Sequence, residues 1–112
     1  TFGYVAGELG KRKIAFIFAR ESMKEPRLGP QLKKVFGGAW IANEGLTAET
    51  AAAVLAAGEA DAVAFGKDYI SNPDLVARLK AGAPLNAWNM QTFYSEGAPG
   101  YTDYPALENA VA

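Results

Sequence analysis

The sequence contains no cysteine and no histidine among its 112 residues. Without cysteine, the chain has no disulfide framework, no thiolate nucleophile and no cysteine-based metal site. Without histidine, it lacks the usual acid/base group at neutral pH and the commonest metal ligand in proteins. We therefore predict no metal site. Any catalysis would depend on Tyr, Lys, Arg, Asp or Glu side chains, or on a cofactor.

The sequence also lacks an excess of charge of either sign. Its 11 basic and 12 acidic residues leave a formal net charge of -1, which predicts no binding to nucleic acid or to an anionic membrane surface. No apolar run approaches the roughly 20 residues that cross a bilayer, and no signal-peptide pattern opens the chain. We expect a cytoplasmic protein, and the start at Thr1 without a methionine suggests a fragment.

Three short apolar runs predict β-strands at residues 14–18, 39–42 and 62–65. Apolar runs without alternation are typical of parallel sheets, in which both faces of each strand are covered. A helical pattern precedes the first run, and another helix between the first two runs ends at Gly37. The sequence therefore predicts a β/α array with right-handed crossovers.

Two further helices carry local start and stop signals. Thr47 is a good N-cap for a helix over residues 48–57, and Gly58 follows it at the position where left-handed backbone ends a helix. Downstream, Asn72 is predicted to cap a helix with Pro73 at its first position. The buried stripe that we expect on that helix consists of Leu75, Val76 and Leu79.

Residues 86–112 show no helix or strand pattern but are rich in aromatic side chains. These are Trp88, Phe93, Tyr94, Tyr101 and Tyr104. So many aromatic residues argue against disorder, and a long irregular segment of this kind is expected to lie across a surface. Three parallel strands cannot cover both of their own faces. The chain is thus expected to be part of an eight-stranded β/α barrel, which needs about 250 residues, or a small open sheet that pairs with a partner.

Two of the expected strand tips carry groups that suit a phosphate. In β/α arrays the ligand binds beyond the carboxyl ends of the strands, where this chain has Asn43-Glu44-Gly45 and Gly66-Lys67. Exposed backbone N–H groups at a glycine turn, with the start of the following helix, make a phosphate cradle, and Lys67 adds a cation. The alternative is that both glycines only permit tight turns and that Lys67 is a solvated cap.

Several segments together resemble the old yellow enzyme family. The strand ending in Phe65-Gly66-Lys67 is followed by Asn-Pro-Asp-Leu at 72–75, and the family has Phe-Gly-Arg and the same tetrapeptide. Ala-Pro-Leu-Asn at 83–86, Thr-Phe-Tyr at 92–94 and Gly-Tyr-Thr-Asp-Tyr-Pro at 100–105 are similar to the family's closing segments in order and spacing. The resemblance covers residues 14–107. The tail motifs are the specific evidence for this resemblance, whereas the glycine turns alone are weak evidence for it.

The resemblance implies an α/β fold in which residues 1–112 are the C-terminal portion of one TIM (β/α)8 barrel domain. This portion would comprise the last three β/α units and an irregular tail at 86–112. The family takes hydride from NAD(P)H on a bound FMN and reduces activated alkenes such as enones, maleimides and nitro compounds. The implied partners are the remaining N-terminal part of the barrel and a small-molecule alkene, with homo-oligomerisation left open. A non-catalytic barrel fragment and another phosphate-binding barrel enzyme are the alternatives.

Residue by residue, the resemblance implies an FMN phosphate site and part of a substrate wall. The FMN-binding residues would be Asn43, Glu44, Gly45, Gly66 and Lys67. Tyr94 would line the substrate side of the flavin, and core packing beside Phe93 is the alternative. No catalytic residue is expected, because the family's catalytic side chains belong to earlier strands.

Two positions depart from the family's pattern. Lys67 stands where the family has Arg, and a lysine contacts a phosphate as a point charge whereas arginine binds it bidentately. Glu44 stands where the family has a small residue, and a carboxylate aimed at a phosphate would repel it. We therefore expect Glu44 to act through its backbone, with the side chain turned out toward Lys67.

Overall fold

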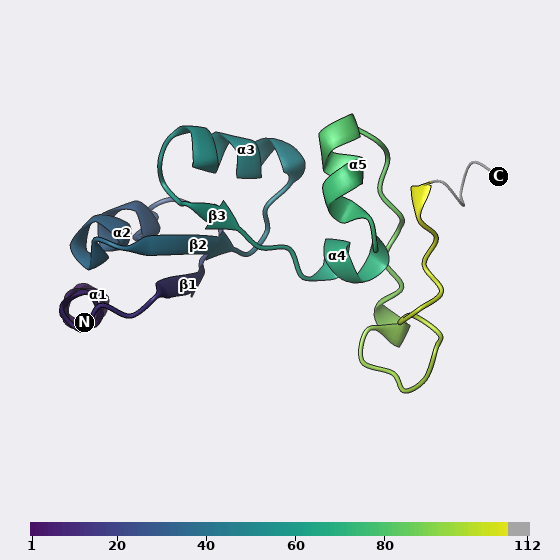
Figure 1. Cartoon of the computed structure of the whole chain (residues 1–112), viewed down its shortest axis with the longest axis horizontal. Coiled ribbons are helices and arrows are strands. Elements are labelled where there is room, and N and C mark those ends of the chain that lie inside the picture. Colours follow the sequence, from purple (N-terminus) through teal and green to yellow (C-terminus); the bar gives the residue numbers. More distant parts are fainter. Residues whose placement is uncertain (108–112) are drawn as a thin grey trace. The chain divides into compact units, whose positions relative to one another are not determined.

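The computed structural model describes residues 1–107 of the chain. The chain forms two compact units, Thr1–Ala64 and Phe65–Ala112 (Figure 1). In the order of the chain, the first unit consists of α1 (Phe2–Lys11), β1 (Phe16–Arg20), α2 (Gly29–Phe36), β2 (Ala39–Asn43), α3 (Ala48–Ala56) and β3 (Ala62–Val63). The second contains α4 (Lys67–Ser71), α5 (Leu75–Ala81) and the 3-10 helix η1 (Met90–Thr92).

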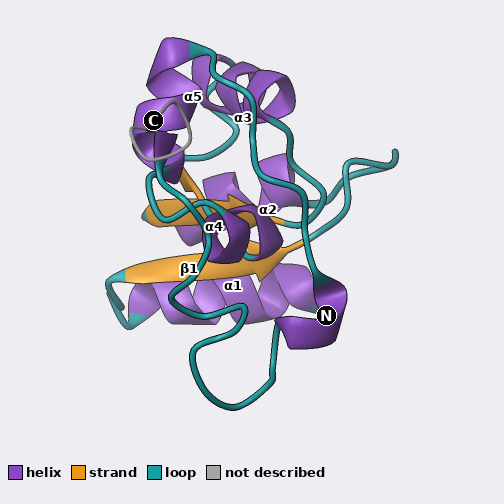
Figure 2. Ribbon diagram, turned by 90° about the vertical axis from the view of Figure 1, so that its right-hand side faces the viewer, coloured by secondary structure: helices purple, strands orange, loops and turns teal. Residues whose placement is uncertain are grey.

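The three strands of the first unit form one parallel sheet in the order β1-β2-β3. Phe16 pairs with Ala39 at one end of β1, and Ile41 pairs with Ala62 across to β3. Helices α2 and α3 connect these parallel strands, which are drawn in orange in Figure 2. The α/β class predicted from the sequence is therefore confirmed.

Local chemistry determines where the helices of the first unit begin and end. Thr47 accepts a hydrogen bond from the backbone of Thr50, and the Thr50 side chain in turn bonds the Thr47 backbone, so the two residues form a capping box. Gly37 ends α2 in a left-handed conformation with φ of 77°, which a residue with a Cβ rarely adopts. Both boundaries follow the predicted signals.

One face of the sheet is covered and carries the core of the first unit. Trp40 is 4% exposed and lies among residues of α2 and α3, such as Pro30 and Val54. Ala19 and Ala42 point to the same side, where a cavity of about 30 Å³ remains. This volume holds about one water molecule, so the cavity is too small for a substrate or a flavin.

The opposite face of the sheet is open. Side chains alternate along a strand, so Phe16 and Phe18 point away from the core, and they are 50% and 51% exposed. Among the described residues β1 pairs only with β2, which leaves its other edge without a neighbouring strand. A strand edge without a neighbour and two half-exposed phenylalanines are the features expected of a sheet that forms only part of a barrel.

The second unit differs from the prediction at its helix boundaries. Asn72 does not cap the following helix; it ends the one-turn helix α4 and is fully buried. Helix α5 consequently starts at Leu75, and Val76 is 60% exposed whereas Arg78 is 2% exposed. The predicted stripe was wrong at Val76 because the face that packs runs through Leu75 and Arg78. No helix within residues 1–107 has both the length and the apolar character needed to cross a membrane.

Candidate functional site

The tip of β2 is held in place by the side chain of Asn43. Its amide Nδ2 donates a hydrogen bond of 2.9 Å to the carbonyl oxygen of Ala64, just after β3. The backbone of Ala64 donates to Ala42, also at 2.9 Å. The predicted third strand was longer than the observed β3, but these two bonds continue the sheet contact to Ala64. Asn43 therefore ties the carboxyl ends of two strands together.

The next two residues turn the chain through left-handed backbone. Glu44 has a φ of 96° and Gly45 a φ of 68°, and a non-glycine residue at such a φ is uncommon. A Cβ added to Gly45 would meet no atom within 4 Å. The turn therefore leaves open space beside the Gly45 backbone, where a ligand could approach.

The Glu44 carboxylate forms an ion pair with the Nε of Arg20, the last residue of β1. The pair joins two neighbouring strand tips and lies at the surface, with 78% of the Arg20 side chain exposed. A carboxylate paired with a guanidinium repels a nearby anion less than an isolated one does. The Glu44 side chain is thus an acceptable neighbour for a phosphate.

Glu21, directly after β1, has a structural role that the sequence did not reveal. The Glu21 carboxylate accepts hydrogen bonds from the backbone N–H groups of Leu28 and Gly29, at 2.8 and 2.9 Å. It therefore satisfies donors at the start of α2. Glu21 lies far upstream of these donors, so no standard capping spacing indicated the contact.

In the second unit, Gly66 and Lys67 begin α4. A Cβ at Gly66 would meet no atom within 4 Å, so this backbone is also open to a ligand. The Lys67 ammonium lies 5.2 Å from the centre of the Trp88 ring, within the range of a cation–π interaction. The indole Nε1 of Trp88 donates a hydrogen bond of 2.7 Å to the Asp68 carboxylate.

Tyr94 follows η1 and is 95% exposed. Its neighbour Phe93 is half-buried, so the two adjacent side chains have different surroundings. Among the described residues, Tyr94 therefore makes little packing contact. Further along the tail, the Tyr104 hydroxyl accepts a hydrogen bond of 3.0 Å from the backbone of Asn89.

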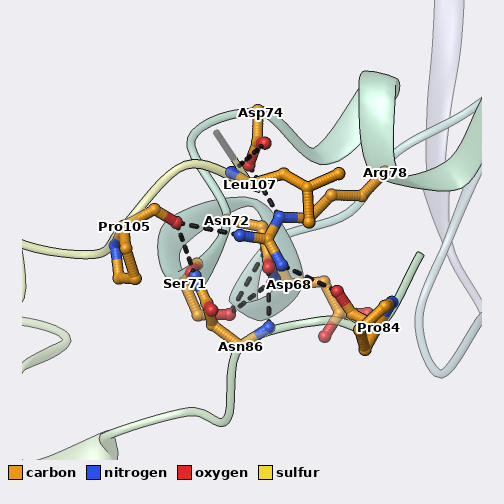
Figure 3. Close-up of polar contacts among 9 residues, drawn as sticks. All are labelled: Asp68, Ser71, Asn72, Asp74, Arg78, Pro84, Asn86, Pro105 and Leu107. Carbon is orange, nitrogen blue, oxygen red and sulfur yellow. Dashed lines mark hydrogen bonds and ion pairs between the residues drawn. The ribbon is translucent and has the colours of Figure 1, made fainter. Parts of the chain in front are cut away.

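A cluster of buried and partly buried polar side chains holds the tail against α4 and α5 (Figure 3). We call Asn72, Asp74, Arg78 and Asn86 the tail clamp. Asn72 donates to the carbonyl of Asp68 and accepts from the backbone of Asn86, both at 2.8 Å. Asn86 donates its side-chain amide to the carbonyls of Ser71 and Pro105, at 2.8 and 2.9 Å. The clamp therefore joins segments that lie far apart in the sequence.

Arg78 is the centre of the tail clamp. Its guanidinium donates to the Asp74 carboxylate at 2.8 Å and to the carbonyls of Pro84 and Pro105 at 2.7 and 3.0 Å. The backbone N–H of Leu107 and then the Arg78 guanidinium, both bonded to the Asp74 carboxylate, lower the pKa of Asp74. The ion pair of Asp74 and Arg78 was not predicted from the sequence, although their spacing of one helical turn was a signal for it; nothing local indicates the two carbonyl contacts.

The site residues expected from the sequence are divided between the two units. Asn43, Glu44 and Gly45 lie in the first unit, whereas Gly66, Lys67 and Tyr94 lie in the second. Within residues 1–107, no group of three or more acidic, histidine or cysteine side chains is arranged to hold a metal ion.

The chain is similar to curated proteins that are much longer than it is. It is 40% identical over 107 residues to a probable flavin mononucleotide-dependent alkene reductase of Leishmania infantum, a match covering 93% of this chain and 29% of the relative. It is 43% identical over 81 residues to 12-oxophytodienoate reductase 2 of Arabidopsis thaliana, covering 71% of this chain and 22% of that protein. The chain thus spans less than a third of the length of these relatives. No family model matches it.

Solved structures give the same result for the fold. The old yellow enzyme homologue from Zymomonas mobilis superposes with a TM-score of 0.86 and 38% identity, covering 93% of this chain and 32% of that one. Morphinone reductase superposes with a TM-score of 0.88 and 37% identity, covering 99% of this chain and 32% of that one. These neighbours are TIM barrels, so the three-stranded sheet corresponds to part of such a barrel. The chain, which spans about one third of the length of these structures, is similar in sequence and fold to members of the old yellow enzyme family.

Proposed function

We propose that the chain is part of an FMN-dependent oxidoreductase that takes hydride from NAD(P)H and reduces activated alkenes such as enones, maleimides and nitro compounds. The observation that carries this proposal is the identity of 40% to a flavin mononucleotide-dependent alkene reductase along 93% of the chain. A relative solved with tetrahydroNAD, morphinone reductase, supports a nicotinamide donor. A cytoplasmic location and the possibility of homo-oligomers belong to the same proposal.

The remaining N-terminal part of the barrel is the partner that this proposal requires. The open face of the first unit supports it, because Phe16 and Phe18 are each half-exposed on a sheet whose other face is packed. Residues 1–112 would then be one portion of a single barrel domain, with residues 86–112 as its irregular tail, of which residues 108–112 lie outside the described part of the chain. Below, the complete protein means the barrel that contains this chain.

The residues of the two strand tips fit an FMN phosphate. Open space lies beside the backbones of Gly45 and Gly66, and the Glu44 charge is paired with Arg20. Lys67 is exposed, and its ammonium makes no hydrogen bond or ion pair among the described residues. We assign the phosphate to Asn43, Glu44, Gly45, Gly66 and Lys67, with Asn43 holding the turn and Glu44 acting through its backbone.

The chain's own residues would bind and orient rather than react. A bound flavin would supply the hydride chemistry of the reaction. Lys67 would compensate the charge of the phosphate, and the glycine backbones would donate N–H groups to it. Tyr94 would present its phenol to the substrate, since it combines an apolar ring with a polar group. No residue of this chain is assigned a catalytic role.

Lys67 provides the test of the phosphate assignment. In the complete protein, Lys67→Ala is expected to weaken FMN binding by about 1–3 kcal/mol, the range for losing a charged hydrogen bond. Lys67→Arg is expected to hold or tighten binding, because a guanidinium binds phosphate bidentately. Flavin fluorescence titration measures both, and Lys80→Ala, which removes another exposed lysine, is the matched control. Equal FMN affinity in Lys67→Ala and Lys80→Ala would show that Lys67 is only a solvated cap.

Tyr94 provides the test of the substrate wall. Tyr94→Phe is expected to change stability by no more than about 0.5 kcal/mol, as for an exposed position. It should alter alkene turnover or substrate preference while leaving flavin reduction by NAD(P)H nearly intact. Stopped-flow measurement of the two half-reactions separates these effects. Tyr101→Phe, at a tail residue that is 82% exposed, is the control, and the same response from both variants would remove the specific role of Tyr94.

A further inference from the structure

Trp88 lies between two charged groups of α4 that have opposite signs. The Lys67 ammonium is 5.2 Å from the centre of its ring, and its Nε1 donates to the Asp68 carboxylate at 2.7 Å. The indole is itself about half exposed. Its side chain therefore contributes little core packing, and its two polar contacts are its most specific interactions.

The hydrogen bond to Asp68 fixes the ring relative to a well-anchored helix. The Asp68 backbone carbonyl accepts hydrogen bonds from Asn72 at 2.8 Å and from the Ser71 hydroxyl at 3.3 Å. Asn72 and Ser71 are fully buried. The orientation of the indole is thus determined by a helix whose backbone is hydrogen-bonded to buried side chains, although the indole belongs to the irregular tail.

A fixed ring restricts a side chain that is otherwise flexible. A lysine ammonium is a point charge on four rotatable bonds, and ordering it on ligand binding costs free energy. The ring face attracts the ammonium from one side only, so its N–H donors on the other sides stay available. Among the described residues these donors have no protein acceptor, so the ammonium is oriented by the ring while its N–H groups stay open to solvent or to a ligand.

We propose that Trp88 is a positioning residue that holds Lys67 ready for the phosphate of the cofactor, and that it thereby favours the phosphorylated flavin over riboflavin. The inference rests on the proposed function, since it requires Lys67 to face an FMN phosphate. Trp88 itself touches neither the phosphate nor the reacting atoms in this account. Its contribution is to reduce the freedom that Lys67 loses on binding.

The experiment compares the affinities of the complete protein for FMN and for riboflavin, which lacks the phosphate. Trp88→Leu is expected to weaken FMN binding about two- to tenfold and to leave riboflavin binding unchanged. Trp88→Phe keeps a ring face but loses the Nε1 donor, so its FMN affinity should lie between those of the wild type and Trp88→Leu. In a Lys67→Ala background, Trp88→Leu should have no further effect on FMN, because the side chain that it positions is gone.

Each other outcome overturns the inference at an identifiable step. If the wild type binds FMN no more tightly than riboflavin, or if Lys67→Ala leaves FMN affinity unchanged, the phosphate assignment fails and the inference fails with it. If Lys67→Ala weakens FMN but Trp88→Leu does not, only the inference fails. Equal weakening of both flavins, or a loss that persists without Lys67, would make Trp88 a structural residue. Should Trp88→Leu not fold, the more conservative Trp88→Phe decides by the same FMN-to-riboflavin ratio.

Discussion

Replacing Arg78 with methionine in the complete protein is expected to lower the free energy of unfolding by about 3 kcal/mol. Arg78 is 2% exposed and donates to the Asp74 carboxylate and to two backbone carbonyls. Removing one partner of a buried ion pair costs about 3–5 kcal/mol, because the other groups remain without it. We expect a loss at the lower end of this range, because the Asp74 side chain is 21% exposed and water screens part of its charge.

Urea denaturation measures this effect, and Arg12→Met is its matched control. Arg12 forms the same kind of one-turn ion pair, with Glu8 at 2.8 Å, but its side chain is 65% exposed, so its loss should cost less than about 1 kcal/mol. The stability loss of Arg78→Lys should lie between those of Arg12→Met and Arg78→Met, because an ammonium does not reproduce the planar arrangement of guanidinium donors. Equal effects of Arg78→Met and Arg12→Met would mean that Arg78 does not hold the tail.

The second large effect is expected at Phe18, on the open face of the sheet. If the rest of the barrel covers this face, Phe18→Ala should destabilise the complete protein by about 3–5 kcal/mol, as for a phenylalanine in a core. The half exposure of Phe18 in this chain alone would predict a much smaller loss. The difference arises because the missing strands would bury the ring from the other side.

Leu55→Ala is the control for this measurement. Leu55 is 41% exposed, comparable to Phe18, but it belongs to α3 and not to the sheet. Its truncation should cost about 1 kcal/mol, the usual value for a position without special features. Thermal or urea unfolding of the two variants compares them directly. A Phe18→Ala loss no larger than that of Leu55→Ala would contradict the burial of this face inside a barrel.

Local signals predicted the first unit well because its boundaries depend on local chemistry. Thr47 and Gly37 act within one turn of their own helices, so their neighbours in the sequence are enough to identify them. The apolar runs of the strands also indicated that the sheet needs cover on both faces. The half-exposed Phe18 agrees, since one of these faces is open in the described chain.

The second unit was harder to predict because its polar residues serve distant partners. Asn72 followed by Pro73 has the local pattern of a helix start, yet the Asn72 side chain bonds the backbone of Asn86. Arg78 was not expected in the interior, because a charged residue is buried only where enough acceptors surround it. Those acceptors include the carbonyl of Pro105, and no pattern around Arg78 indicates that the tail returns to it.

The tail clamp also turns the segment between its two ends into a closed loop. The Asn86 side chain donates a hydrogen bond to the carbonyl of Pro105 at 2.9 Å, so the two ends of the segment 87–104 lie close together. A loop with fixed ends tolerates changes of length at a cost that grows only slowly with the number of residues. Insertions or deletions around Tyr94 could therefore reshape what this loop presents without disturbing the clamp. If Tyr94 lines the substrate as proposed, such a loop would let related proteins acquire different substrate preferences while keeping the same fold.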